Sequence, residues 1–213
     1  MMMFTLAIVF SLALAVNGVG FNITLYSGLD QTGASLLLLE PNHDLGTIGF
    51  EDVTKSICGY GAWLLYEDPN YSDGQFTHLL VTPFYACENL PDTRQDKVSS
   101  VRFIGTGNFY NEVLTLYEHP EGAGGEYLVV RDEDNLFNFN DVTSTVAVTG
   151  NSSWTLYHDQ YYEGSSVCVV PSNIENSDVF FGYFSIDDLG FQNDQVSSVR
   201  KGCFSADIKY FEF

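Results

Sequence analysis

Trp154-Thr155-Leu156-Tyr157 is a short alternating run, followed by a polar turn that ends at Gly164. Such a run before a glycine-containing turn predicts a β-strand entering a hairpin. The Leu-Tyr pair of this run recurs at Leu25-Tyr26, Leu65-Tyr66, Leu116-Tyr117 and Leu156-Tyr157. The four tyrosines are 40, 51 and 40 residues apart, so the chain contains four units in two pairs. The boundary between the two copies is predicted at 107–111, which gives domains at 19–106 and 107–213.

A second predicted strand follows the turn in each unit and completes a hairpin. These second strands are expected at 35–39, 75–81, 126–130 and 165–170. No segment keeps a helical period over three turns, so only short helical turns are expected, near 44–50 and 187–191. The tail at 206–213 alternates, and is expected to add a strand, to cover the domain interface, or to fray.

The chain opens with an apolar run from Leu6 to Val16. This run is too short to span a membrane comfortably and predicts a secretory signal at 1–18, cleaved near Gly18 or, alternatively, near Ala15. A secreted, extracellular protein without membrane insertion is therefore expected. Glycosylation sequons occur at Asn22, Asn70 and Asn151.

The 213-residue chain is strongly acidic, with a formal net charge of −20. This charge argues against nucleic acid as a partner, because nucleic-acid binding needs a basic face. It favours cations and basic surfaces. Hydrophobic residues make up 45% of the chain and aromatic residues 15%, which is too apolar for a disordered acidic polymer. The composition therefore predicts a folded acidic protein.

The four cysteines that follow the predicted signal favour disulfides in a secreted chain. Two fall in each half, so pairing of Cys58 with Cys87 and of Cys168 with Cys203 is favoured. The other two connectivities would link the halves, and both remain open.

Asn193-Asp194-Gln195-Val196-Ser197-Ser198 gathers amide, carboxylate and hydroxyl oxygens within six residues. A second copy, Gln95-Asp96-Lys97-Val98-Ser99-Ser100, lies 98 residues earlier. Asn, Asp and Ser are also common in ordinary turns. The repetition of the cluster in an acidic chain favours a calcium site, because calcium takes six to eight oxygen ligands.

The repeated hairpins resemble those of the βγ-crystallin family. The fourth unit carries that family's Tyr-x-x-x-x-Tyr-x-Gly motif as Tyr157, Tyr162 and Gly164. The other units carry partial versions, at Tyr26, Gln31 and Gly33, at Tyr66, Tyr71 and Gly74, and at Tyr117, Gly122 and Gly124. The resemblance covers essentially the whole chain after the signal. It implies an all-β fold of two domains, each a sandwich of two antiparallel Greek-key motifs.

The resemblance also implies that the oxygen clusters of paired Greek keys face each other and build two calcium sites together. The four clusters are 51–56, 95–100, 140–145 and 193–198. In the first domain, Ser99 and the Lys97 carbonyl would join Asp52 in one site. The other site there would need a hydroxyl where Lys55 stands. We predict that this site is lost or very weak, because the ammonium would compete with the ion.

In the second domain, the resemblance implies two intact sites. Their ligands are Ser144, the Val142 carbonyl and Asp194 in one site, and Ser197, the Gln195 carbonyl and Asp141 in the other. The expected cofactor is therefore about three calcium ions.

The favoured function is a secreted, calcium-binding structural protein. The alternative is an extracellular recognition module, such as a protease inhibitor or a toxin-like or defence binder. The apolar run at 180–184 is the candidate binding loop for that alternative, and interdomain packing is the other interpretation of the run. The histidines are scattered and no catalytic motif is present, so no enzyme activity is expected. The expected partners are calcium and an extracellular matrix component or another secreted protein, with the chain a monomer or weak dimer.

Overall fold

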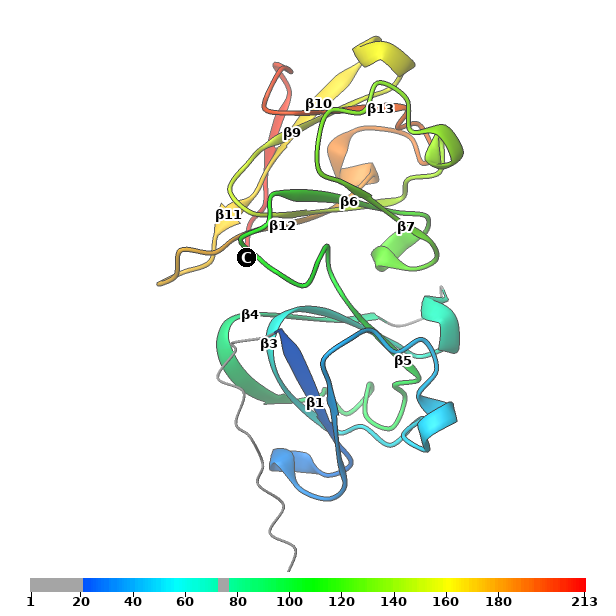
Figure 1. Cartoon of the computed structure of the whole chain (residues 1–213), viewed down its shortest axis with the longest axis vertical. Helices are drawn as coiled ribbons and strands as arrows, with labels where there is room; N and C mark the ends of the chain where they lie inside the picture. Colours follow the sequence, from blue (N-terminus) through cyan, green and yellow to red (C-terminus); the bar gives the residue numbers. More distant parts are fainter. Residues whose placement is uncertain (1–20, 73–76) are drawn as a thin grey trace, which may run out of the picture.

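The computed structural model describes residues 21–72 and 77–213, and the predicted signal at 1–18 and Gly74 lie outside these ranges. The fold is all-β (Figure 1). The strands are β1 (Asn22–Tyr26), β2 (Ser35–Leu38), β3 (Ser56–Tyr66), β4 (Thr77–Asn89), β5 (Ser100–Phe103), β6 (Val113–Tyr117), β7 (Glu126–Val129), β8 (Thr145–Thr149), β9 (Trp154–Tyr157), β10 (Ser166–Val170), β11 (Ser172–Asn173), β12 (Phe180–Ser185), β13 (Ser198–Lys201) and β14 (Ile208–Tyr210).

Helical structure in the described residues is confined to single 3-10 turns, as the sequence predicts. These turns are Leu29–Gln31, Leu45–Ile48, Pro69–Tyr71, Pro120–Gly122, Phe137–Phe139, Gln160–Tyr162 and Asp187–Leu189. Within the described part of the chain, no helix is long and apolar enough to cross a membrane.

The first domain is built around two long strands, β3 and β4, which pair along their whole length. The first half of β3 pairs with β1, and β2 extends that layer. The second half of β3 pairs with β5. A register shift between Gly59 and Gly61 marks the point where the sheet bends from one layer to the other. The sequence predicts a strand at 75–81. Residues 75 and 76 lie outside the described ranges, and β4 continues beyond 81 to Asn89.

The second domain has two separate sheets (Figure 1). One has the order β11-β12-β8-β6-β7 and the other β13-β9-β10-β14. Strand β12 belongs to the fourth unit in sequence, but it pairs with β8 of the third. This exchange of a strand between hairpin units is the Greek-key arrangement, so the predicted fold class is confirmed. The boundary predicted at 107–111 lies in the segment between β5 and β6.

Each domain has its own apolar core, and a third cluster joins the two. Trp63 lies in the first core and Trp154 in the second, and both are fully buried. The third cluster combines residues of both domains, among them Leu64, Tyr117 and Phe181. Phe181 of the apolar run 180–184 is fully buried in this cluster, which confirms interdomain packing for that residue, while Phe184 packs in the core of the second domain.

The hairpins have the conformation that the motif implies. Tyr66 packs on Tyr71, and Tyr157 on Tyr162, with ring centroids 5.6 Å apart in both pairs. The described motif glycines have positive φ, 81° at Gly33, 73° at Gly124 and 76° at Gly164. Residues with a Cβ avoid this conformation, which explains the glycine at this position.

The favoured disulfide pairing is confirmed. Cys58 bonds to Cys87 and joins β3 to β4, and Cys168 bonds to Cys203 and joins β10 to the segment after β13. The C-terminal tail then adds β14 as a parallel partner of β10. Beyond it, the Phe211 ring packs against Phe181 in the interdomain cluster, so the tail both adds a strand and covers part of the interface.

Candidate metal centre

The segments 51–56, 95–100, 140–145 and 193–198, called here the oxygen clusters, face each other in pairs within each domain. We number the positions of each cluster from one to six. The acid at position two has a left-handed backbone in all four clusters, with φ between 52° and 59°. Its amide donates to the position-four carbonyl of the facing cluster. These hydrogen bonds run from Asp52 to Val98 (3.1 Å), Asp96 to Thr54 (2.9 Å), Asp141 to Val196 (3.1 Å) and Asp194 to Thr143 (3.3 Å).

Each cluster is also fixed to the hairpin of its own unit. The position-five amide donates to the carbonyl of the motif tyrosine in every unit. The pairs are Lys55 with Tyr26 (2.8 Å), Ser99 with Tyr66 (2.8 Å), Ser144 with Tyr117 (2.9 Å) and Ser197 with Tyr157 (3.0 Å). Each cluster is therefore hydrogen-bonded to the hairpin of its own unit and is not a free surface turn.

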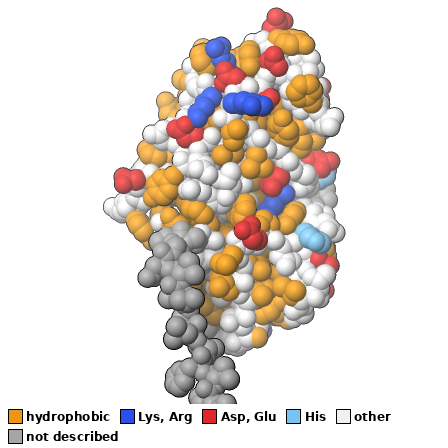
Figure 2. All heavy atoms as spheres, viewed as in Figure 1, with side chains coloured by type: hydrophobic (Ala, Val, Ile, Leu, Met, Phe, Trp, Pro, Cys, Tyr) orange, Lys and Arg blue, Asp and Glu red, His pale blue; other side chains and the backbone are white. Residues whose placement is uncertain are grey.

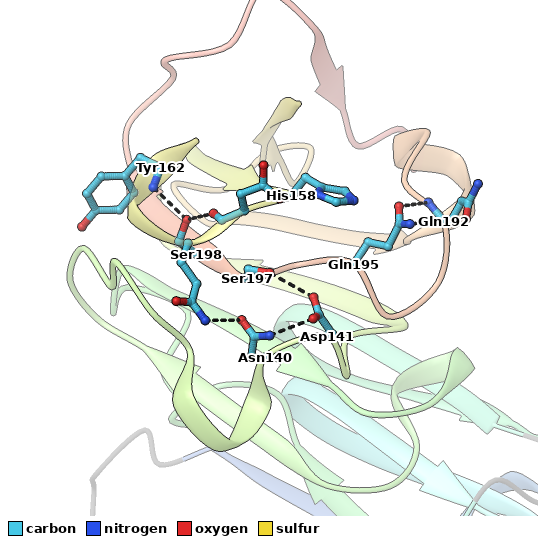
Figure 3. A network of polar contacts seen from close by, with 10 residues as sticks. Asn140, Asp141, His158, Tyr162, Gln192, Gln195, Ser197 and Ser198 are labelled. Carbon is cyan, nitrogen blue, oxygen red and sulfur yellow. Dashed lines mark hydrogen bonds and ion pairs between the residues drawn. The ribbon is translucent and has the colours of Figure 1, made fainter. Parts of the chain in front are cut away.

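Asp141 and Ser197 form the best-defined side-chain contact of the second domain (Figure 3). The Ser197 Oγ donates to Asp141 Oδ1 at 2.9 Å, and Asn140 Nδ2 donates to the other carboxylate oxygen at 2.8 Å. Asp141 lies in the third unit and Ser197 in the fourth. The structure therefore brings together a carboxylate and a hydroxyl from two Greek keys, which is the pairing that the family resemblance implies.

Ser144 and Asp194, the other predicted pair of this domain, are placed differently. The Ser144 Oγ donates to the Glu118 carbonyl at 2.7 Å. The Asp194 amide lies beside Ser144, because it bonds to the carbonyl of the preceding residue, Thr143. No hydrogen bond joins the Ser144 and Asp194 side chains among the contacts of the described residues. Two oxygens of this site, the Ser144 hydroxyl and the Glu118 carbonyl, are adjacent, and the carboxylate is carried by the facing cluster.

In the first domain, one acid contacts a serine hydroxyl and the other contacts a lysine. The Ser99 Oγ donates to Asp52 Oδ1 at 3.0 Å, which matches the Ser197–Asp141 contact. In the reciprocal position, Lys55 Nζ lies 3.3 Å from Asp96 Oδ2. The side chain of Lys97, whose carbonyl is a predicted ligand, turns to Glu67 at 3.5 Å. Lys55 thus places a positive charge beside the acid that would otherwise face a cation.

The position-six hydroxyls have a structural role that sequence reasoning missed. Each accepts a hydrogen bond from a hairpin amide five residues after the motif tyrosine, and donates to the carbonyl two residues after that tyrosine. The acceptor carbonyls belong to Gly28 for Ser56, Asp68 for Ser100, His119 for Thr145 and Asp159 for Ser198. The donor amides belong to Gln31, Tyr71, Gly122 and Tyr162 in the same order.

These hydroxyls lie over turns in which two consecutive residues have positive φ, such as Tyr161 at 62° and Tyr162 at 64°. Left-handed backbone costs about 1–3 kcal/mol per non-glycine residue unless the surroundings hold it. The two hydrogen bonds of the position-six hydroxyl stabilise this backbone conformation. Its recurrence in all four units of the sequence was the available signal.

The donor chemistry of the clusters fits calcium. Within 21–72 and 77–213, no three His, Cys, Asp or Glu side chains gather into a metal-binding group. An ion at these clusters would instead be held by one carboxylate with hydroxyl, carbonyl and water oxygens. Calcium accepts such hard oxygen ligands in irregular number and geometry.

Few basic side chains are present, and those on the face shown in Figure 2 lie beside acidic ones. Elsewhere in the contacts of the described residues, Arg200 and Asp132 form an ion pair, with Nε 3.4 Å from Oδ2. The eight Lys and Arg residues are therefore drawn largely into local pairs, while 28 acids leave the surface negative.

No family model matches the chain. Gamma-crystallin D of Homo sapiens is 30% identical over 144 residues, which cover 66% of this chain and 74% of that protein. Gamma-crystallin D of Mus musculus is 28% identical over 149 residues, with the same coverage. Among solved structures, Geodin, a beta-gamma crystallin from Geodia cydonium, aligns with a TM-score of 0.63 at 20% identity, and covers 85% of this chain and 99% of Geodin.

Proposed function

Because the chain belongs to the βγ-crystallin family, we propose that it is a secreted structural protein that binds calcium through its oxygen clusters and is stabilised by it. The observation that carries this proposal is the repeated contact between a position-five hydroxyl and the position-two acid of the facing cluster. It occurs as Ser99–Asp52 at 3.0 Å and as Ser197–Asp141 at 2.9 Å.

Three sites follow from the cluster chemistry, and we name each by its acid. The Asp52 site takes Ser99 and the Lys97 carbonyl. The Asp194 site takes Ser144 and the Val142 carbonyl, with the Glu118 carbonyl beside them at 2.7 Å from Ser144. The Asp141 site takes Ser197 and the Gln195 carbonyl. A bound ion would supply a positive charge that joins the two Greek keys of a domain.

The chain prepares these sites by fixing the backbone on both sides. The position-two amide holds the acid against the facing cluster, and the position-five amide holds the hydroxyl against the hairpin. In each site, the hydroxyl donates a hydrogen bond to a neighbouring oxygen. It would have to rotate to present a lone pair to an ion.

The remaining candidate site, which would lie between Lys55 and Asp96, is proposed to bind no ion. Lys55 Nζ lies 3.3 Å from the Asp96 carboxylate and neutralises it. A divalent cation would have to displace this ammonium and would find no hydroxyl at position five. The expected stoichiometry is therefore about three ions per chain.

Calcium-dependent stability suits an extracellular setting. Extracellular calcium modules are filled at about millimolar calcium even when they bind weakly. A site with a dissociation constant near ~10 µM would then stabilise its domain by roughly 2.7 kcal/mol. That amount is a large part of an ordinary folding free energy. Secretion, glycosylation and a monomeric or weakly dimeric state remain part of the proposal.

A recognition function is not proposed. Its candidate loop, 180–184, is strand β12, where Phe181 is fully buried in the interdomain cluster and Phe184 is buried in the core of the second domain. An apolar run that is already packed is not available to a partner. The proposed role is therefore structural.

Calorimetric titration of calcium into EDTA-stripped protein lacking residues 1–18 tests the proposal. The parent chain should bind about three ions, and Asp194→Ala one fewer. Lys55→Ser should gain a site. Arg131→Ser, which removes an exposed positive charge outside the clusters, is the matched control and should leave the stoichiometry unchanged. Absence of binding heat together with an unchanged melting temperature at millimolar calcium would refute calcium binding.

A further inference from the structure

Arg102 crosses from the first domain into the second. It lies on β5 and is 2% exposed. Its Nη1 donates to the Gly124 carbonyl at 3.1 Å, and its Nη2 donates to the Gly122 carbonyl. Its Nε donates to the Tyr66 hydroxyl at 2.8 Å, and that hydroxyl donates in turn to the Gly122 carbonyl at 2.7 Å. One guanidinium therefore bonds the second unit to the hairpin of the third.

The surroundings of Arg102 hold a charge that would be costly to bury alone. The guanidinium lies over the rings of Tyr66, Tyr71 and Tyr117, at 5.3, 4.8 and 4.8 Å from their centroids. Glu126 of the second domain is 3.7 Å from Nη1. Cation–π contacts, carbonyl acceptors and a carboxylate together compensate the lost hydration, and most of them exist only when the domains are docked.

Arg200 is the matched residue of the fourth unit and behaves differently. Its side chain is 41% exposed. It lies over Tyr162 and Phe204 of its own domain, at 5.5 and 4.1 Å. The same repeat position therefore makes a domain-crossing contact in one copy and a local one in the other.

On the first-domain side, Arg102 is close to the Asp52 site in the chain. Ser99, a ligand of that site, is three residues before it. Ser100, the next residue, accepts the Tyr71 amide at 3.2 Å. The Tyr71 carbonyl accepts the Gly124 amide of the second domain at 2.7 Å. The hairpin of the second unit is thus tied to the Asp52 site at one end and to the other domain at its turn.

On the second-domain side, the hairpin that Arg102 holds is the one that serves the Asp194 site. The Gly122 amide donates to Thr145 Oγ1 at 3.3 Å, and Thr145 follows the ligand Ser144. The Glu118 amide donates to the Gly125 carbonyl at 3.0 Å, and the Glu118 carbonyl accepts the Ser144 hydroxyl. Both ends of the connection are therefore position-five hydroxyls of calcium sites in different domains.

We propose that Arg102 couples the Asp52 site of the first domain to the Asp194 site of the second, so that calcium at either site strengthens binding at the other. This inference rests on the proposed calcium function. An ion at one site orders its hairpin, and Arg102 transfers that order to the hairpin of the other site. The second ion then loses less conformational entropy on binding, which is positive cooperativity.

The Asp141 site supplies the internal control. Its acid, Asp141, lies in the third unit, but its hydroxyl, Ser197, is fixed to the hairpin of the fourth unit, whose arginine, Arg200, contacts rings of its own domain. Acid-to-alanine variants isolate the pairs. Asp141→Ala leaves the Asp52 and Asp194 sites, and Asp194→Ala leaves the Asp52 and Asp141 sites. The three double variants among Asp52, Asp141 and Asp194 leave one site each.

The experiment is calcium calorimetry on these variants in the full chain after residue 18. For each two-site variant, the product of its two binding constants is divided by the product of the corresponding single-site constants. The ratio should be about fivefold or more for the Asp52 and Asp194 sites. It should be close to one for the Asp52 and Asp141 sites. Arg102→Lys, which keeps the charge but lacks the planar fork, should reduce the first ratio to about one. Arg200→Lys should not change it.

The outcomes separate the two proposals. Binding at all three sites with both ratios equal to one would overturn the coupling and leave the calcium function intact. A high ratio that survives Arg102→Lys would overturn the role of Arg102. No binding in any variant would overturn both proposals. If Arg102→Lys fails to fold, the comparison of the two ratios in the unaltered Arg102 background still decides whether the domains are coupled.

Discussion

The facing clusters of the first domain keep the same backbone as those of the second, although one of them has exchanged a hydroxyl for a lysine. The Asp96 amide donates to Thr54 at 2.9 Å, and the Asp194 amide donates to Thr143 at 3.3 Å. Yet Asp96 faces the ammonium of Lys55 at position five, whereas Asp194 faces a cluster that has Ser144 at position five. The comparison teaches that the backbone arrangement of the cluster is kept when the position-five side chain changes, and under the proposed function that side chain would set the affinity for cations.

The largest expected difference between the domains is in their response to calcium. With a dissociation constant near ~10 µM per site and millimolar calcium, removing both second-domain sites with Asp141→Ala and Asp194→Ala should abolish about 5 kcal/mol of calcium-dependent stabilisation. Asp52→Ala should abolish about half as much. Urea unfolding measures this, with Trp63 and Trp154 as one buried reporter per domain. Unfolding in EDTA is the control for direct effects, and equal losses would contradict a two-to-one distribution of sites.

Lys55→Ser should give the first domain a second calcium site, so that both domains have two. The new hydroxyl restores position five, so millimolar calcium should stabilise the variant by about 2.7 kcal/mol more than the parent if the new site has a ~10 µM dissociation constant. Without calcium the loss should be less than about 1 kcal/mol, because Lys55 and Asp96 are an exposed pair. Lys97→Ser, which removes the neighbouring lysine from its pair with Glu67, should not add an ion.

Position four offers a smaller and purely structural comparison. Thr54 and Thr143 are fully buried, and within the described chain their hydroxyls have no hydrogen-bond partner. The facing clusters have Val98 and Val196 at the same position, both fully buried. Thr143→Val should therefore stabilise the protein by about 1 kcal/mol by removing an unsatisfied hydroxyl. Calcium binding should not change, because only the backbone of this position faces the site. Thermal unfolding with Thr54→Val as the parallel variant tests both domains, and destabilisation by either change would contradict the argument.

The smallest expected effect is a pH dependence at the interface. Burial raises the pKa of the Glu126 carboxyl above its ordinary value, although Arg102 opposes this. Between the ordinary and the raised pKa, the folded chain binds a proton that the unfolded chain has released. Stability should therefore fall as pH rises through that window. Glu126→Gln should remove this part of the slope in urea unfolding at a series of pH values, and the exposed Glu163→Gln should not.

Much of the fold could be predicted from the sequence because its signals are local and repeated. The Leu-Tyr pairs end the first strand of each hairpin as expected, at Tyr26, Tyr66, Tyr117 and Tyr157. Each disulfide also joins two cysteines of the same half of the chain, as expected. The Asp141–Ser197 and Asp52–Ser99 contacts were predicted only through the family resemblance, because nothing local indicates which clusters face each other.

The interface could not be predicted in the same way. Val101-Arg102 and Val199-Arg200 are identical pairs at matched positions of two copies. Only the docking of the domains decides that one arginine is buried and the other stays exposed. The position-six hydroxyls were visible in the sequence, but their two partners lie 23 to 39 residues earlier in the chain, and no local pattern connects them.

The acceptors that Arg102 uses have a consequence for how the interface tolerates change. Its two partners in the hairpin of the second domain are main-chain carbonyls, which no point mutation removes. A side chain at Gly122 would nevertheless be excluded, because a Cβ there would lie 2.8 Å from the Tyr183 hydroxyl and 2.9 Å from Leu64. The second domain thus contributes main-chain carbonyls to this contact, and the first contributes Arg102, whose matched residue in the other copy is Arg200. The polar part of the interface therefore depends on Arg102 and on the absence of a side chain at Gly122, beside the buried apolar cluster that joins the two domains.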